Sequence, residues 1–267
     1  MQTAIAQIAA LTIFGNDVLR GYSREEFWPA STVFTFCKTV RFAALNGAAE
    51  TIFADNPVQW ISRVQIGGAV GLRFHHVSRN DPNFPDRVSV GFVGGGGRWL
   101  IEALHSDQSE LWEAGWLIGN RDDPDRKIWN VCYRRVGNSG NHLPSDNTDL
   151  VTLKHDLKVA LTRIEQFARS QKLANFATSF RKAIDVLESE APLSGTYHPD
   201  LACSFSVPLE ARKLLAAAQF AWMFGGMGSW DDLGFVRDQQ QEYVCITDIL
   251  FKLLIRAICQ SANSSCI

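Results

Sequence analysis

The chain has 267 residues, of which 46% are hydrophobic and 20% are charged, proportions typical of a folded globular protein. Its net charge is −2, and no block of lysine or arginine occurs. Proteins that bind nucleic acid through its phosphates carry a basic stripe, so we expect no nucleic-acid partner. No run of apolar residues is long enough for a membrane span, and residues 1–20 lack the basic start of a signal peptide. We therefore expect a cytoplasmic protein.

The N-terminal half begins with a helical pattern and continues with extended ones. Apolar side chains crowd one side of residues 1–20, which predicts a helix. Three segments rich in β-branched and aromatic residues predict strands: 32–45, 60–77 and 87–92. Gly67 and Gly68 would form a hairpin turn within the second of them, and a run of four glycines at 94–97 interrupts the chain after the third.

The clearest extended pattern follows the four glycines. Three alternating segments are separated by short polar turns: 98–105, 111–120 and 128–136. Such a series predicts an antiparallel β-meander. Trp112 and Trp116 would share one face of its middle strand, because side chains two residues apart point the same way.

The hydrophobic period changes after a polar loop at 137–149. Four segments then have apolar residues at helical spacing: about 153–167, 173–187, 208–222 and 239–262. The third helix should end at Gly225 and Gly226, since glycine favours a helix C-terminus. The last helix carries few charges, so we expect it at the centre of the helical half.

These patterns predict an α+β fold, in which an N-terminal antiparallel β-meander packs against a C-terminal helical bundle. The β-rich half, with its N-terminal helix, would occupy residues 1–140, and the helical half residues 150–267. The aromatic face of the meander needs to be covered, so we expect the two halves to share one core.

The four glycines raise the question of a phosphate-binding loop. Such loops lead into a helix, whereas here Arg98 begins a predicted strand. We therefore expect a flexible hairpin or bulge, with Arg98 as the partner of any anion that the loop meets. His75 and His76 would point to opposite faces of a strand, and no histidine spacing suits a metal, so we expect neither metal nor cofactor.

Residues 222–232 combine two tryptophans, two methionines and three glycines with two aspartates. In the structural interpretation this is a helix end and a tight connection packed by Trp230, where Ser229 and Asp232 form a capping box. In the functional interpretation the glycines expose backbone beside an aromatic pocket, with Asp231 and Asp232 as polar anchors. The same residues would also suit an anchor patch for a protein partner.

Eight tryptophans in one chain favour a recognition surface, because tryptophan is enriched at interface hot spots. The predicted binding residues are Arg98, Trp112, Trp116, Trp230, Asp231 and Asp232. We expect a non-catalytic, cytosolic protein-interaction module that binds a protein partner. An immunity protein that neutralises a bacterial toxin is the subclass we expect. The alternative is an enzyme or small-ligand binder of an unfamiliar family, whose site lies between sheet and helices. Its polar candidates are Arg98, His105, Asp231 and Asp232.

Overall fold

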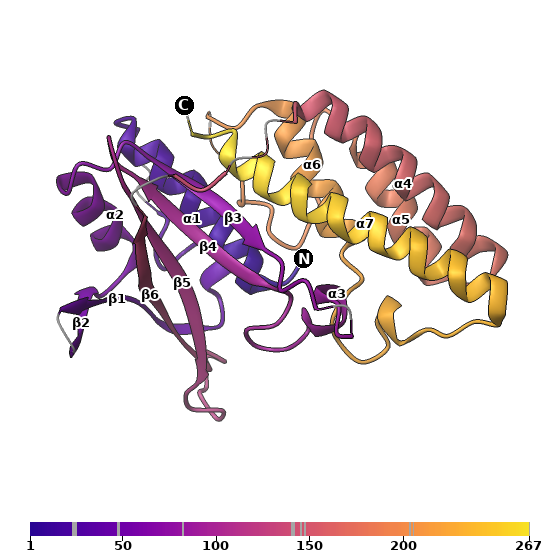
Figure 1. Cartoon of the computed structure of the whole chain (residues 1–267), viewed down its shortest axis with the longest axis horizontal. Helices are drawn as coiled ribbons and strands as arrows, with labels where there is room; N and C mark the ends of the chain where they lie inside the picture. Colours follow the sequence, from indigo (N-terminus) through magenta and orange to yellow (C-terminus); the bar gives the residue numbers. More distant parts are fainter. Residues whose placement is uncertain are drawn as a thin grey trace.

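The computed structural model describes residues 1–22, 26–46, 49–81, 83–139, 142–144, 146, 148–202, 204 and 206–266. A mixed β-sheet from the N-terminal half lies at one end of the molecule, and helices that come mostly from the C-terminal half lie at the other (Figure 1). The predicted α+β class is confirmed.

The sheet contains six described strands in the order β2-β1-β6-β5-β4-β3. Their bounds are Cys37–Asn46 (β1), Ala49–Ala54 (β2), Gly71–Val77 (β3), Arg98–Leu104 (β4), Ser109–Ile118 (β5) and Trp129–Ser139 (β6). β4, β5 and β6 form the predicted antiparallel meander, which β3 extends on one side. β1 runs parallel to β6 on the other side, so the whole sheet is mixed.

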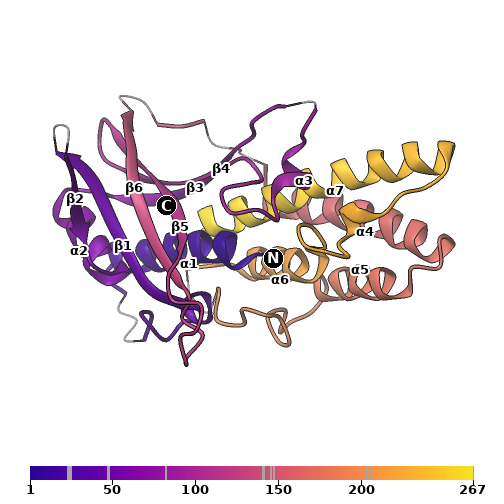
Figure 2. The same cartoon turned by 90° about the horizontal axis from the view of Figure 1, so that it is seen from below.

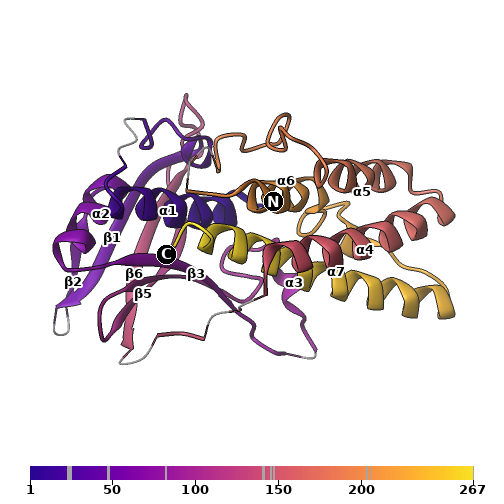
Figure 3. The same cartoon turned by 90° about the horizontal axis from the view of Figure 1, so that it is seen from above.

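The described helices are Thr3–Leu19 (α1), Pro57–Ile66 (α2), Asp86–Ser89 (α3), Leu150–Ser170 (α4), Ala174–Val186 (α5), Leu209–Ala221 (α6) and Arg237–Asn263 (α7). Two 3-10 turns, Thr32–Phe34 (η1) and Trp230–Asp232 (η2), complete the regular structure. α1 and α2 pack on the sheet, and α4 to α7 form a bundle beside it (Figures 2 and 3). α7 contacts α4 and α6 of the bundle and also α1 and β3, so it joins the bundle to the sheet but does not lie at the centre of the helical half, where the sequence predicts it. No helix of the described residues is both long enough and apolar enough to cross a membrane.

The strand predicted from residue 60 is wrong in its first part, because residues 57–66 form α2. Asn56 caps this helix with its side chain, and Pro57 occupies the first helical turn. Trp60 and Val64, one turn apart, are both buried. The prediction therefore followed the β-branched composition of the segment and missed the helix-capping signal of Asn56 and Pro57 in the sequence.

Three other boundaries also differ from the prediction. Residues 87–92 do not form a strand, and β4 already has β3 and β5 as its two neighbours. The first strand begins at Cys37, after the 3-10 turn η1. The third C-terminal helix ends at Ala221, four residues before Gly225.

The core is one hydrophobic cluster whose members come from α1, α2, the sheet and the four C-terminal helices. Its centre under the sheet is aromatic. Phe42 stacks on Trp60 at 4.5 Å and on Tyr133 at 5.0 Å between ring centroids, and Trp112 meets both Phe42 and Trp60 edge-on. Burial of such rings is the main stabilising contribution in a layer of this kind.

Two asparagine side chains occupy the open edge of the sheet at β3. Asn16 of α1 donates to the carbonyl of Leu72 (2.9 Å) and accepts from its N–H (2.7 Å). Asn263 of α7 does the same at Phe74, with distances of 3.0 and 2.6 Å. Each amide thus replaces a peptide group of the missing neighbour strand.

We predict that Asn16→Ala and Asn263→Ala each lower the free energy of unfolding by about 1–3 kcal/mol, because each leaves backbone groups of Leu72 or Phe74 unsatisfied. The loss should be larger for Asn16, which is buried. Urea unfolding measures both, with exposed Asn83→Ala as the control. Equal stability of all three variants would contradict the proposed edge closure.

Candidate functional site

Two predicted binding residues, Trp112 and Trp230, are fully buried. Trp112 belongs to the aromatic layer under the sheet. Trp230 donates from Nε1 to Thr247 Oγ1 (2.8 Å), and its ring lies 5.2 Å from Phe176 and Phe180 between centroids. Both side chains contribute to packing in this structure, so neither can touch a partner at the surface.

The two aspartates of the 222–232 segment differ in role. Asp232 accepts from the N–H groups of Gly228 and Ser229, and the capping box with Ser229 is complete, as the structural interpretation predicts. Asp231 is buried and pairs with Arg87, whose Nη1 lies 2.5 Å from Asp231 Oδ1. The other carboxylate oxygen of Asp231 is buried without a hydrogen bond.

Arg98 lies on the exposed side of β4, where it makes three hydrogen bonds to Glu113 at 2.7 to 3.2 Å. His105 follows the opposite end of β4. The four polar candidates of the enzyme hypothesis, Arg98, His105, Asp231 and Asp232, are therefore not brought together.

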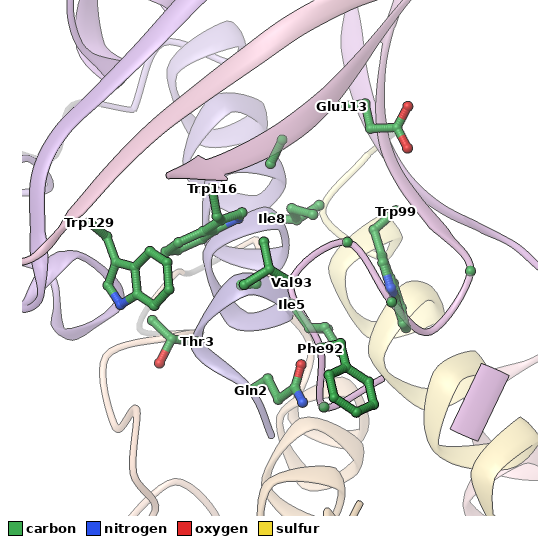
Figure 4. A pocket seen from close by; sticks show the side chains of 16 residues that line it. Gln2, Thr3, Ile5, Ile8, Phe92, Val93, Trp99, Glu113, Trp116 and Trp129 are labelled. Atoms are coloured by element: carbon green, nitrogen blue, oxygen red, sulfur yellow. The ribbon is translucent and has the colours of Figure 1, made fainter. Parts of the chain in front are cut away.

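Trp116, in contrast, opens onto a pocket of about 220 Å³. Figure 4 shows Trp116 and Trp129 close together on one side of it and Trp99 on the other. The rings of Trp116 and Trp129 are nearly perpendicular, with centroids 5.8 Å apart. These tryptophans come from three neighbouring strands, β4, β5 and β6, so the sheet forms one wall of the pocket.

The other walls come from α1 and from the glycine-rich segment 91–97, called the glycine loop below. Ile5 and Ile8 of α1 line the pocket beside the sheet. From the glycine loop, Val93 lies between Trp116 and Trp99, and Phe92 lies beside Gln2 (Figure 4). They are 62% and 70% exposed. The pocket is thus an apolar hollow with further apolar side chains at its rim.

The two glycine-rich segments that stand out in the sequence touch each other. A Cβ atom on Gly91 would lie 2.6 Å from the Cα of Gly225, so backbone packs directly on backbone. Within the loop, a Cβ on Gly95 would lie 1.8 Å from the carbonyl oxygen of Ser89. Only glycine permits these approaches.

Backbone groups of the glycine loop are bonded within the protein. Gly95 N–H donates to the Phe92 carbonyl, and Gly96 N–H donates to Ser89 Oγ, each at 2.9 Å. Two of the four consecutive glycine amides are therefore already used. This arrangement does not resemble a phosphate cradle, in which successive amides point at the anion.

His75 and His76 lie on opposite faces of β3, as predicted. Burial lowers the pKa of His76, against the opposing effects of the Gly96 carbonyl and Asp86. The ring is therefore neutral near pH 7, and its Nε2 hydrogen-bonds the Gly96 carbonyl at 2.7 Å. On the other face, His75 Nε2 lies 2.7 Å from the buried carboxylate of Glu102. His76 is thus a support of the glycine loop.

Arg87 joins the segment before the glycine loop to the helical half. It pairs with Asp231 and also with Asp248 of α7, where Nε lies 2.6 Å from Oδ1. Burial raises the pKa of Asp231, and Arg87 opposes this rise. The glycine loop, which forms one wall of the pocket, is consequently held against the bundle by the ion pairs of Arg87 and by the contact between Gly91 and Gly225.

The chemistry that the pocket offers is aromatic and apolar contact. Among the described residues that line it, Glu113 alone is ionisable, and it is already paired with Arg98. Within the described part of the chain, no cluster of three or more histidine, cysteine, aspartate or glutamate side chains is placed to hold a metal. The arrangement suits binding of an apolar group better than proton transfer.

No protein-family model, curated protein or solved structure matches this chain.

The predicted binding residues include Trp116 but not Trp99, Trp129 or the glycine-loop residues Phe92 and Val93. A usable signal was present for the tryptophans, because Trp99 and Trp129 lie on the strands that flank the strand of Trp116. No local sequence pattern predicts that α1 and the glycine loop pack beside these tryptophans, because this packing depends on contacts between segments distant in the sequence.

Gly91→Ala should destabilise the protein, because its Cβ would meet the Gly225 backbone and no side chain can move aside. We expect a loss of about 1–3 kcal/mol in urea unfolding, with greater acrylamide quenching of tryptophan fluorescence as the glycine loop separates. Gly234→Ala is the matched control, since nothing lies within 4 Å of its Cβ position. Equal stability of the two variants would contradict the packing of Gly91 on Gly225.

Arg87→Ala should be more damaging, by about 3–5 kcal/mol near pH 8, because it leaves Asp231 buried without its counter-ion. The raised pKa of Asp231 means that the folded state holds this proton more tightly than the unfolded state, so stability falls as pH rises through that pKa. The loss should therefore be smaller near pH 4.5. Adding Asp231→Asn should recover stability at high pH. A loss that is independent of pH, with no recovery, would refute this account.

Proposed function

We propose that this protein is a non-catalytic interaction module that binds a protein partner by accepting one apolar side chain in the pocket of Trp99, Trp116 and Trp129. The observation that carries the proposal is an open apolar hollow walled by three tryptophans. Buried aromatic anchors in such hollows dominate the energy of many protein interfaces.

The size of the pocket favours a side chain over a cofactor. A dry cavity of about 150 Å³ holds benzene, whereas sites for drug-sized ligands and cofactors span about 300–1,000 Å³. The pocket of about 220 Å³ lies between these values and nearer the first. One aromatic or branched aliphatic side chain fits this space.

The rim of the pocket supports a protein partner. Phe92 and Val93 are largely exposed, and Ile118, directly across from Trp129 on the neighbouring strand, is 48% exposed. Contiguous apolar surface of this kind marks interaction sites, because its removal from water on binding is favourable in free energy. A partner that fills the pocket would also cover these side chains.

A small-ligand binder is the second candidate, and one observation favours it. Thr3 and Ala4, in the first turn of α1, also line the pocket, and Gln2 makes no side-chain cap there. Helix N-termini without caps favour a hydrogen-bond acceptor. A small aromatic carboxylate could therefore satisfy both the apolar wall and this helix end.

The immunity-protein subclass is a narrower proposal within the first candidate. It requires that the partner be a toxin and that binding abolish the activity of that toxin. Co-expression of the partner with and without this chain, followed by measurement of cell growth, decides it.

The proposal is tested by placing a photo-crosslinking amino acid at Val93, on the rim, and separately at Ile52 of β2, an exposed control outside the pocket lining. We expect a specific protein adduct from Val93 alone. Trp116→Ala should then weaken binding of that purified protein about 30-fold, the size of a hot spot of about 2 kcal/mol.

Ala114→Phe fills the same pocket without removing a wall and should weaken binding similarly, which guards against a folding defect in the first variant. Unchanged affinity in both variants would refute the pocket as the binding site. Saturable binding of indole-3-acetate in place of a protein adduct would decide for the small-ligand candidate.

A further inference from the structure

We infer that the groove between α4 and α7 is a second docking surface, and that its occupant is an acidic amphipathic helix of a partner protein. The inference does not rest on the tryptophan pocket, which lies against the sheet. It rests on the shape, the exposed apolar floor and the unpaired positive charge of the groove.

α4 and α7 pack side by side along the outside of the bundle, as Figures 1 and 3 both show. The groove between them encloses about 510 Å³. Its lining extends over residues 155–163 of α4 and 246–256 of α7, more than two turns of each helix. The surface is therefore elongated along the helices, as a bound helix requires.

The floor of the groove is apolar where solvent reaches it. Val159 of α4 is 57% exposed and Ile249 of α7 is 43% exposed, with Leu253 partly buried beside them. Single exposed apolar residues are common on protein surfaces and need no explanation. Here they come from two helices and line one groove, so a partner can cover them together.

The groove also carries positive charge that the protein does not neutralise itself. Arg163 and Lys252 are exposed and make no ion pair with any described residue. Neighbouring cations differ from them, because Lys158 pairs with Glu188 and Arg256 pairs with Asp146, each at 2.8 Å.

One carboxylate, that of Asp156, also lines the groove, against the free charges of Arg163 and Lys252. The excess is therefore positive, in a chain whose net charge is −2. A general basic composition cannot explain it. An occupant with carboxylates would gain ion pairs at both margins of the groove.

An amphipathic helix with glutamates beside an apolar stripe matches both features. Its apolar residues, spaced by three and four, would cover Val159 and Ile249, and its carboxylates would reach Arg163 and Lys252. An anionic membrane could meet the same two cations. The apolar side chains line a groove between two helices, which favours a helix that fills it over a flat lipid surface.

The probe for the test is a fluorescein-labelled peptide of about 15 residues, composed of leucine and glutamate with the leucines on one helical face. Fluorescence anisotropy at low ionic strength should show saturable binding. The affinity should fall as salt is added, because exposed ion pairs are screened. A peptide with lysine in place of glutamate, and a scrambled peptide of equal composition, should both bind at least about tenfold more weakly.

The double variant Arg163→Glu and Lys252→Glu should weaken binding of the acidic peptide at least about tenfold, and Ile249→Ser should weaken it through the floor. Lys182→Glu, at an exposed position of α5, is the matched control and should leave binding unchanged. Thermal unfolding of each variant checks that the bundle is intact.

Three results would each overturn the inference. The first is equal binding of the acidic and lysine peptides, and the second is unchanged affinity in the double variant. The third is binding to vesicles of phosphatidylcholine and phosphatidylserine that depends on Arg163 and Lys252, without any binding of the acidic peptide. That last outcome would assign the groove to a lipid surface instead.

Discussion

The relative placement of sheet and helices depends on the closure of one sheet edge by two asparagine amides. An edge strand exposes N–H and C=O groups at every second residue, and a buried group without a partner costs free energy. Asn16 and Asn263 satisfy those groups at Leu72 and Phe74 of β3. Because the first amide comes from α1 and the second from the end of α7, both helices are held against the same strand. The end of the bundle that contains the C-terminus of α7 is thereby fixed beside the sheet.

The position of the segment that follows β3 depends on this closure, because the segment begins where β3 ends. It leaves the sheet toward the bundle, where Arg87 meets Asp231 and Asp248, and then returns to the sheet through the glycine loop. On the way back, Gly91 packs on Gly225. The glycine loop, one wall of the tryptophan pocket, is therefore supported by the helical half, although the tryptophans belong to the sheet. The pocket needs both halves in place, so neither half alone would present it.

Periodicity in the sequence was sufficient to predict the meander and the long helices, since both patterns are local. It could not predict the parallel pairing of β1 with β6, which joins residues about 90 positions apart. The candidate site shows the same limit. Trp112 and Trp116 lie on one face of β5, yet the first is fully buried under α2 by Trp60, while the second opens onto the pocket. Alternation predicts the face of a strand, but not which part of that face a helix covers.

The two proposed surfaces have different chemistry, and this difference assigns them different roles in binding. Exposed charges such as Arg163 and Lys252 act over longer distances and mainly raise the rate of encounter, whereas a desolvated aromatic anchor mainly slows dissociation. Asp248 of α7 pairs with Arg87, in the segment before the glycine loop, and lies one turn from Lys252. α7 therefore supplies both Lys252 of the groove and the carboxylate that Arg87 meets beside the glycine loop, so both surfaces depend on the position of this one helix.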